Sequence, residues 1–545
     1  MEPLNFMKNE SSAARNLWVL VAIVSVAAGI FLAGIRKDLP YSHESDENIY
    51  VERAVFMAAS GDLNPHWFGN PGSTVLYPLA ALFHTWHAIE YGGAFLSADE
   101  NIISVFMSDQ SQFYLLGRLL TVCYALLSVL VTYLVGRRLF GERVALLGTW
   151  FSVLSPLLVY YAQVVRTDLA GSFFGMLSLW LMLRLYDEPS AKNQLLAGLS
   201  IGFSVGTRYF MITLVPILIA IDILIVRQSR SDLDRPSLSG RAITLGLLAV
   251  LLGFMVCTPF FVLDVPTALR SLVSEARPRH LGADGLSPAE NLTWYLTNAI
   301  PASISLPVAL LAAIGVLLVL IRRRAEQLLV LGFVVVFVLS TSLSRLHWNR
   351  WMIQIFPILC LLAAETLCGT SSWLSRLFRL GPKYQHVPLC VLIALVSVLP
   401  LHDLLLYEIS QTATTTRILA REWIIKNLPP ETKVAYEPFS VPLSGADMLV
   451  FGPKMLAARR SLLDYYRSGY RYLVVSSGIY DRFFAESKRY SREVAFYKTL
   501  FANGHLVREL NPSLIRGGPI IRIYKLEGPP FSEQGDPQSD EEPQK

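Results

Sequence analysis

The sequence predicts an all-α, multi-pass membrane bundle of about 11 to 13 transmembrane helices, followed by a small C-terminal α/β domain. The first observation is composition: of the 545 residues, 53% are hydrophobic and only 16% are charged. A soluble domain usually carries about 25% charged residues. The second is that apolar residues form blocks of about 17 to 23, the length that crosses a hydrocarbon layer. The third is that the chain after about residue 410 has short strand-like runs instead of such blocks.

The apolar blocks define the spans of the bundle. The first block, 17–35, is long enough to cross a membrane and lacks a clear small-residue cleavage site, so we expect a transmembrane helix rather than a cleaved signal peptide. The stretch 194–226 is too long for one pass, and its polar centre, 206–209, predicts a turn between two passes. The predicted spans are approximately 17–35, 113–135, 144–161, 169–186, 194–207, 209–226, 242–263, 302–321, 327–343, 351–369 and 387–406.

Lysine and arginine collect in five short connections, which predicts the sidedness of the bundle, because positive charge in short loops marks the cytoplasmic side. These connections are Arg137-Arg138 with Arg143, Arg184 with Lys192, Arg227 to Arg241, Arg322 to Arg324, and Arg376 to Lys383. We therefore expect a protein of the inner or plasma membrane with several segments on the extracytoplasmic side. Those segments are 36–112, 163–168, 207–209, 264–301, 344–350 and everything after about 407.

The predicted domains are a transmembrane domain over 1–410 with an outer loop at 36–112, an extracytoplasmic α/β domain over 411–527, and a disordered tail over 528–545. Within the outer loop, 73–88 is apolar but interrupted by histidines. We interpret it as an interfacial helix, with a short additional pass paired with 94–107 as the alternative. In the C-terminal domain, helical spacing covers 412–428 and 492–501, and strand-like runs cover 433–436, 472–476, 506–510 and 520–526.

Charge and cysteine content exclude two classes of protein. The net charge of +5 is too small to indicate a nucleic-acid partner, and the basic residues lie at helix ends. The five cysteines lie in apolar blocks and form no CxxC pair, so neither a disulfide framework nor a thiolate zinc site is expected.

Acidic and basic residues recur in the predicted outer turns. Asp46 and Glu47 follow the first span, and Arg166 and Asp168 occupy the next outer turn. Taken singly, each has an ordinary explanation, such as an acidic first helical turn or an arginine at the headgroup level. Taken together, two acidic groups and several arginines on one face could gather in one cavity. Arginine binds phosphate oxygens through its planar fork, and a carboxylate removes a proton from an attacking hydroxyl. The pattern therefore indicates group transfer from a membrane-embedded phosphate leaving group.

The chain resembles the GT-C membrane glycosyltransferases over roughly residues 15–480. The closest group is the family of protein O-mannosyltransferases (dolichyl-phosphate-mannose-protein mannosyltransferases) and lipid A aminoarabinose transferases, whose members use polyprenyl-phosphate sugars as donors. The resemblance rests on the order and spacing of short motifs. These are Asp46-Glu47, the loop Gly61 to Phe68, Arg118, Arg166-Thr167-Asp168, the Gly-rich run Gly198 to Arg208, and Arg350 leading into Gln354 to Pro357.

The resemblance implies roles for individual residues. Asp46 corresponds to the proposed catalytic base with Glu47 as its neighbour, and Asp168 corresponds to an acidic residue that shapes the site. The phosphate-binding or donor-binding candidates are Arg208, Arg350, Arg166, His66 and His347. The chain departs from the family at Asn70-Pro71-Gly72 and at Tyr77-Pro78, where many members carry a Pro-Pro pair. This departure bears on the acceptor rather than on the donor.

The expected function is a hexosyl or pentosyl transfer, with inversion, from a polyprenyl-phosphate-linked sugar donor to a protein, lipid or glycan acceptor. Membrane lipids are the other expected partners. The sequence leaves open whether a divalent cation binds near Asp46 and Asp168, because no histidine-rich ligand cluster requires one. One alternative is a transporter or flippase, but transporters place ionisable groups near the bilayer midplane, and the predicted spans are nearly free of mid-helix charge. The exceptions, Asp222 and Glu365, lie near the predicted cytoplasmic ends. The other alternative is a non-catalytic assembly or sensor protein, in which Asp46, Asp168 and Arg350 would not meet.

Overall fold

The computed structural model describes residues 2–42, 44–70, 72–92, 99, 101–231, 236–276, 279–443 and 448–527. The tail predicted at 528–545 lies outside the described residues, as do His43, Pro71 and part of 94–107. The chain divides into two compact parts. The first, which we call the bundle, comprises 2–40 and 46–405, and the second, the C-terminal domain, comprises 41–45 and 406–527.

Among the described residues, eight helical segments are long and apolar enough to cross a membrane. They lie in α1 (Glu2–Ala33), α5 (Ser111–Phe140), α8 (Asp168–Asp187), α10 (Leu214–Ser231), α11 (Gly240–Cys257), α17 (Ala325–Ser342), α18 (Phe356–Leu377) and α19 (Val387–Thr412). Two helices of 17 residues, α9 (Ala191–Thr207) and α16 (Leu306–Arg322), pack lengthwise against α11 and α18. With the bent pair described next, every predicted span has a helical counterpart, and the predicted fold class is confirmed.

The predicted span 144–161 is bent rather than straight. Helix α6 (Glu142–Val153) ends before Ser155, and α7 (Pro156–Ala162) continues at an angle of 66°. Proline lacks an N–H and is tolerated at the first position of a helix. The Ser155 hydroxyl accepts a hydrogen bond from the Leu158 N–H at 3.3 Å and so caps the new helix. The bend therefore follows from the Ser155-Pro156 pair.

Glycines explain the close packing of α9 against α11. A Cβ added at Gly198 would lie 2.2 Å from the carbonyl oxygen of Gly246, and one at Gly202 would lie 2.3 Å from that of Val250. Only glycine permits backbones to approach this closely, as is common between membrane helices. The Gly-rich run that contributes to the family resemblance therefore has a packing role, and it ends at Arg208.

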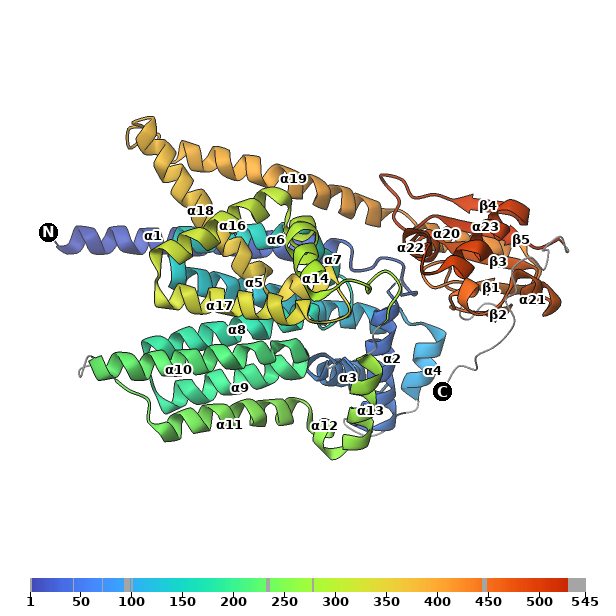
Figure 1. The fold of residues 1–545 in the computed structure, drawn as a ribbon, viewed down its shortest axis with the longest axis horizontal. Coiled ribbons are helices and arrows are strands. Elements are labelled where there is room, and N and C mark those ends of the chain that lie inside the picture. The colour runs from blue at the N-terminus through green and yellow to red at the C-terminus, as the bar shows by residue number, and fades with distance from the viewer. Residues whose placement is uncertain are drawn as a thin grey trace. The chain divides into compact units, whose positions relative to one another are not determined.

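Short helices gather at one end of the bundle. They include α2 (Ser45–Ser60), α3 (Ser73–His87), α4 (Asn101–Ser108), α12 (Pro259–Leu263), α13 (Val265–Glu275), α14 (Pro288–Trp294) and α15 (Ile300–Ile304). Figure 1 shows α3 nearly end-on and α2 running across the direction of the spanning helices. Helix α3 buries Val75, Leu79 and Phe83 in a core that it shares with α2. Helix α3 therefore does not run parallel to the spanning helices, and its interfacial placement stays a prediction.

The C-terminal domain is built on a five-stranded sheet in the order β2-β1-β3-β5-β4. The strands are β1 (Lys433–Tyr436), β2 (Leu449–Phe451), β3 (Tyr472–Ser476), β4 (His505–Leu510) and β5 (Ile521–Lys525). The first three are parallel, and β5 pairs antiparallel with β3 and β4. The helices are α20 (Thr416–Asn427), α21 (Leu462–Arg467), α22 (Ser477–Ala485) and α23 (Ser491–Asn503). The strand β2 and the helices α21 and α22 were not among the predicted elements.

Glu437 follows β1 and is fully buried. Its carboxyl accepts hydrogen bonds from the Tyr497 hydroxyl and from the Ser476 N–H, the latter at 3.0 Å. Burial raises the pKa of Glu437 from 4.5 to about 8. The folded domain therefore keeps the Glu437 carboxyl protonated to a higher pH than the unfolded chain does. The contribution of this protonation to the stability of the domain is complete below about pH 4.5 and is lost as the pH rises to about 8.

We therefore expect Glu437→Gln to remove a pH dependence from the stability of the C-terminal domain. Pulse proteolysis of the full chain in urea, in detergent, would follow cleavage within 448–527 between pH 5 and 8. The wild-type urea midpoint should fall relative to that of the variant as the pH rises. Parallel midpoints across this range would show that Glu437 does not titrate there.

Candidate active site

Four turns at one end of the bundle meet at a cluster of five charged residues. Asp46 lies in the first turn of α2, Arg166 in the connection between α7 and α8, and Asp168 at the first position of α8. Arg208 follows the last residue of α9, and Arg350 lies in the 3-10 helix η4 (Asn349–Gln354). We call these five residues the charged cluster.

Arg166 joins the two carboxylates of the cluster. Its Nη1 donates a hydrogen bond to Asp46 Oδ2, and its Nε donates to Asp168 Oδ2 at 3.0 Å. The other oxygen of Asp168 accepts from Arg208 Nη1 at 2.6 Å. Arg350 completes the cluster, with its Nη2 3.6 Å from Asp46 Oδ2. Residues that are 304 positions apart in the chain, Asp46 and Arg350, are therefore in ionic contact.

Burial divides the cluster into a floor and a rim. The side chains of Asp168, Arg166 and Arg208 are 0%, 2% and 5% exposed, whereas those of Asp46 and Arg350 are 34% and 21% exposed. Buried charges need paired partners, and Asp168 has an arginine at each oxygen. Three arginines against two carboxylates leave one net positive charge. The rim therefore offers a guanidinium and a carboxylate to an arriving anionic ligand.

Neighbouring residues fix the geometry of the floor. Gln354 Nε2 donates to the carbonyl of Asp168 at 3.3 Å. A Cβ at Gly171 would lie 2.9 Å from Arg208 Cδ and 3.0 Å from Gln354 Oε1, so a side chain there would push both residues away. At the rim, the guanidinium of Arg350 lies 4.3 Å from the centre of the Trp348 ring, a cation–π contact that holds it in place. Tyr50 packs beside the cluster, and burial raises its pKa to about 12.

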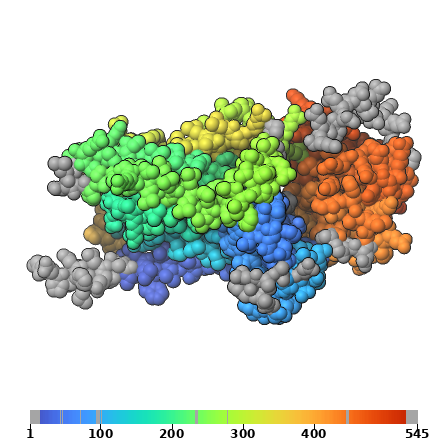
Figure 2. All heavy atoms as spheres, turned by 90° about the horizontal axis from the view of Figure 1, so that it is seen from below, coloured from blue at the N-terminus to red at the C-terminus, as the bar shows by residue number. Residues whose placement is uncertain are grey.

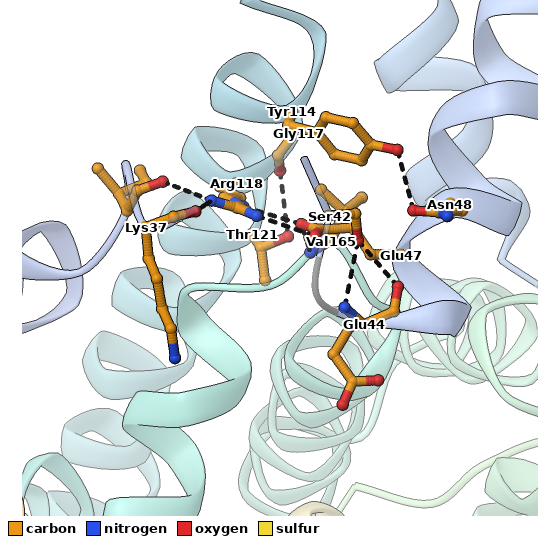
Figure 3. A network of polar contacts seen from close by, with 11 residues as sticks. Lys37, Ser42, Glu44, Glu47, Asn48, Tyr114, Gly117, Arg118, Thr121 and Val165 are labelled. Carbon is orange, nitrogen blue, oxygen red and sulfur yellow. Dashed lines mark hydrogen bonds and ion pairs between the residues drawn. The ribbon is translucent and has the colours of Figure 1, made fainter. Parts of the chain in front are cut away.

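Glu47 points away from the charged cluster. Its oxygens accept from Arg118 Nε and Nη2 at 2.9 and 3.0 Å, and the Val165 N–H donates to Oε1 at 3.0 Å (Figure 3). Both Glu47 and Arg118 are 0% exposed. Arg118 Nη1 also donates to the carbonyls of Ile35 and Lys37 at 3.0 and 2.8 Å. The Glu47–Arg118 ion pair therefore links α2, α5 and the segment that follows α1, and we assign it the role of holding these elements together.

The two candidate histidines have contacts outside the charged cluster. His66 Nε2 lies 2.8 Å from Asp62 Oδ2, and the histidine side chain is 52% exposed. The ring of His347 is 4.6 Å from that of Trp294, and the backbone N–H of His347 donates to the carbonyl of Ala283 at 2.8 Å. The structure therefore brings together Asp46, Asp168, Arg166, Arg208 and Arg350 from the predicted set, and gives Glu47 and His66 other partners.

The charged cluster does not suit a divalent cation. Asp46 and Asp168, the two carboxylates of the cluster, both accept a hydrogen bond from the guanidinium of Arg166. This guanidinium occupies the position that a cation bridging the two carboxylates would need. Hard divalent cations prefer about six or more oxygen ligands. Within the described ranges, no three histidine, cysteine, aspartate or glutamate side chains gather in a metal-binding arrangement.

Comparison with known proteins gives the fold. Residues 102–257 match the model of a family described as dolichyl-phosphate-mannose-protein mannosyltransferase. The crystal structure of ArnT from Cupriavidus metallidurans in the apo state matches with a TM-score of 0.53 and 15% identity, covering 94% of this chain and 98% of that one. The chain has the GT-C fold. ArnT bound to undecaprenyl phosphate gives a TM-score of 0.52 at 15% identity, covering 93% of this chain and 98% of that one.

A structure of an oligosaccharyltransferase matches this chain with a slightly lower TM-score. The apo oligosaccharyltransferase of Archaeoglobus fulgidus gives a TM-score of 0.50 at 13% identity, covering 88% of this chain and 71% of that one. No curated protein sequence gives a significant match. The GT-C fold and the eight apolar helices of the described residues make this chain an integral membrane protein. The likeness establishes the fold, and an activity has to be argued from the residues of the charged cluster.

Proposed function

We propose that this GT-C protein transfers a sugar from a polyprenyl-phosphate-linked donor to an acceptor on the extracytoplasmic side, with inversion at the anomeric carbon. One observation carries the proposal: the charged cluster has a net positive charge and presents an accessible carboxylate and an accessible guanidinium side by side. Five basic connections between the predicted spans support the assignment of the cluster to the extracytoplasmic side.

The donor phosphate would bind the arginines of the rim. Guanidinium groups stay charged and pair with two phosphate oxygens at once. Arg350 is the exposed arginine of the cluster, and Arg166 lies behind it with one nitrogen on Asp46. A lipid-linked phosphate is the natural ligand for an arginine site at the end of a membrane bundle. The ArnT complex with undecaprenyl phosphate, which shares this fold, is consistent with that class of donor.

Asp46 is the base of the proposed reaction because it is the accessible carboxylate, whereas Asp168 is fully buried between two arginines. Its carboxylate takes the proton of an acceptor hydroxyl, and the oxygen attacks the anomeric carbon from the face opposite the phosphate. The bond between the anomeric carbon and the phosphate oxygen breaks, and the phosphate leaves with the electron pair. The arginines stabilise this developing negative charge. As Arg350 turns to the phosphate, its contact with Asp46 weakens, which leaves Arg166 as the cation paired with the base.

The proposal is tested by incubating the purified protein with a panel of polyprenyl-phosphate sugars and measuring release of the free polyprenyl phosphate. The family description names a mannosyl donor, so the panel starts with mannose and includes other hexoses and a pentose. A transferase consumes one or more members of the panel. A flippase or transporter would move the lipid between leaflets and leave the sugar attached.

Arg350→Ala should raise the KM for the donor by about 10- to 100-fold, because hydrogen bonds to charged groups are worth ~1.5–3 kcal/mol. Arg350→Lys should recover part of this loss, since a lysine keeps the charge but not the bidentate fork. Arg345→Ala, at an exposed arginine of the same turn, is the matched control. Equal donor KM values for Arg350→Ala and the control would remove Arg350 from the donor site.

A further inference from the structure

Helix α2 carries a second polar site on the face opposite its buried side. Tyr50, Val51, Ala54, Val55 and Ala58 of this helix are buried in the core shared with α3. On the other side, a hollow of about 430 Å³ opens beside the loop that follows the helix. The hollow is lined by Ile49, Glu52, Arg53, Phe56, Pro65 and His66. The four helical positions recur at intervals of three and four residues, so they share one face.

Arg53 ties this face of α2 to the loop. Its Nη1 donates to the carbonyl of Pro65 at 3.0 Å, and its guanidinium lies 5.0 Å from the centre of the Trp67 ring. Its Nε is buried and has no hydrogen-bond partner in the described structure. The loop is held in turn by Asn64, whose Nδ2 donates to Asp264 Oδ2 at 2.9 Å. Figure 2 shows this blue segment beside the light green residues that follow α11.

The chemistry of the hollow differs from that of the charged cluster. Glu52 and Arg53 offset each other's charge, so the lining gives no excess of positive charge for a phosphate. Phe56, which is 49% exposed, lines the hollow, and Ile49 and Pro65 add apolar surface. A carboxylate, a guanidinium and an imidazole contribute planar polar groups. This combination matches a sugar ring, which has an apolar face of C–H groups and an edge of hydroxyls.

Size and shape also favour a saccharide over a peptide. Small-molecule sites usually measure about 300–1,000 Å³, and the hollow falls in that range. Peptides are commonly bound along a free strand edge or in a long apolar groove. The hollow is bounded by a helix and an irregular loop, neither of which offers a strand edge, and its walls carry charges.

The hollow begins one helical turn from Asp46. Ile49 is three residues after Asp46 on α2, which corresponds to ~4.5 Å along the helix axis. On the basis of the proposed function, we infer that this hollow binds the acceptor, that the acceptor is a saccharide, and that it directs a hydroxyl to Asp46. His66, which the sequence suggested for the donor, then belongs to the acceptor side of the site.

The inference is tested with the full-length protein, a donor that it consumes, and two acceptor pools. One pool contains labelled neutral oligosaccharides, and the other contains labelled peptides rich in serine and threonine. We expect mass spectrometry to detect sugar addition to the oligosaccharides. Phe56→Ala and Glu52→Gln should each raise the KM for the oligosaccharide about tenfold, with a smaller change in the KM for the donor. Ile89→Ala, which alters an apolar residue that is 79% exposed and outside the hollow, should leave both values at the wild-type level.

Acceptor-independent hydrolysis separates failure of this inference from failure of the proposed function. If the protein releases polyprenyl phosphate with water as the acceptor but modifies only peptides, or neither pool, the saccharide assignment is wrong. An equal rise in the two KM values for Phe56→Ala would also overturn it. If no member of the donor panel is hydrolysed or transferred, the proposed function fails and this inference fails with it.

Discussion

Replacing Asp46 with asparagine should reduce sugar transfer by on the order of 10²–10⁴-fold or more, because a positioned general base contributes about that factor. Asparagine has the size of aspartate and keeps an oxygen that can accept the hydrogen bond from Arg166, but it takes up no proton at neutral pH. Asp46 is 34% exposed, so the change leaves no uncompensated charge in a dry interior. The variant should therefore fold and bind the donor lipid.

The measurement is donor consumption under single-turnover conditions, together with donor-lipid binding to the same preparation. Asp109→Asn, at an exposed aspartate just before α5, is the matched control for loss of a carboxylate. It should transfer sugar at the wild-type rate. Wild-type turnover in Asp46→Asn would refute the role of Asp46, whereas loss of donor binding together with turnover would assign it to the phosphate site instead.

The convergence of the charged cluster was predictable from sequence because it depends on topology. Asp168, Arg208 and Arg350 each adjoin an end of a predicted span, and Asp46 lies in the predicted outer loop that follows the first span. Counting passes assigns all four residues to one side of the membrane. Helices in a compact bundle have few positions at which such ends can lie, so opposite charges there find each other. The structure places Asp46 in contact with Arg350 and Asp168 in contact with Arg208.

The directions of individual side chains were not predictable in the same way. Adjacent residues on a helix point about 100° apart, so Asp46 and Glu47 start in different directions. Which of them faces the cluster depends on the rotation of α2, and that rotation is set by burial of Tyr50, Val51 and Ala54 against α3. The resemblance implies a role for Asp46 with Glu47 as its neighbour, and the packing of α2 decides which of the two faces the cluster.

Local irregularities were missed for a different reason. The predicted span 144–161 is apolar throughout, and hydropathy does not report the effect of Pro156 on backbone direction. Strand β2 has only three residues and is assigned through its pairing with β1, a contact between residues 16 positions apart. Such elements are defined by tertiary partners, and no pattern within so short a stretch indicates them.

Glu47→Gln should destabilise the bundle strongly, by about 3–5 kcal/mol, because it leaves the guanidinium of Arg118 buried without its counter-charge. Both side chains are 0% exposed, and two of the Arg118 nitrogens are paired with the carboxylate. Thermal unfolding in detergent and the monodisperse fraction would measure the loss. The double variant Glu47→Leu with Arg118→Met should recover part of it, since an apolar pair often replaces a buried ion pair at little cost.

Asp46→Asn is the informative comparison for Glu47→Gln, because the two residues are adjacent but Asp46 contacts Arg166 whereas Glu47 contacts Arg118. If the assignments are right, Asp46→Asn loses transfer with little change in the unfolding temperature, whereas Glu47→Gln loses stability first and any activity only through it. The double variant then separates the two roles: a protein that regains stability and also transfers sugar without Glu47 shows that this carboxylate holds α2 against α5. A restored fold without transfer would instead return Glu47 to the catalytic site beside Asp46.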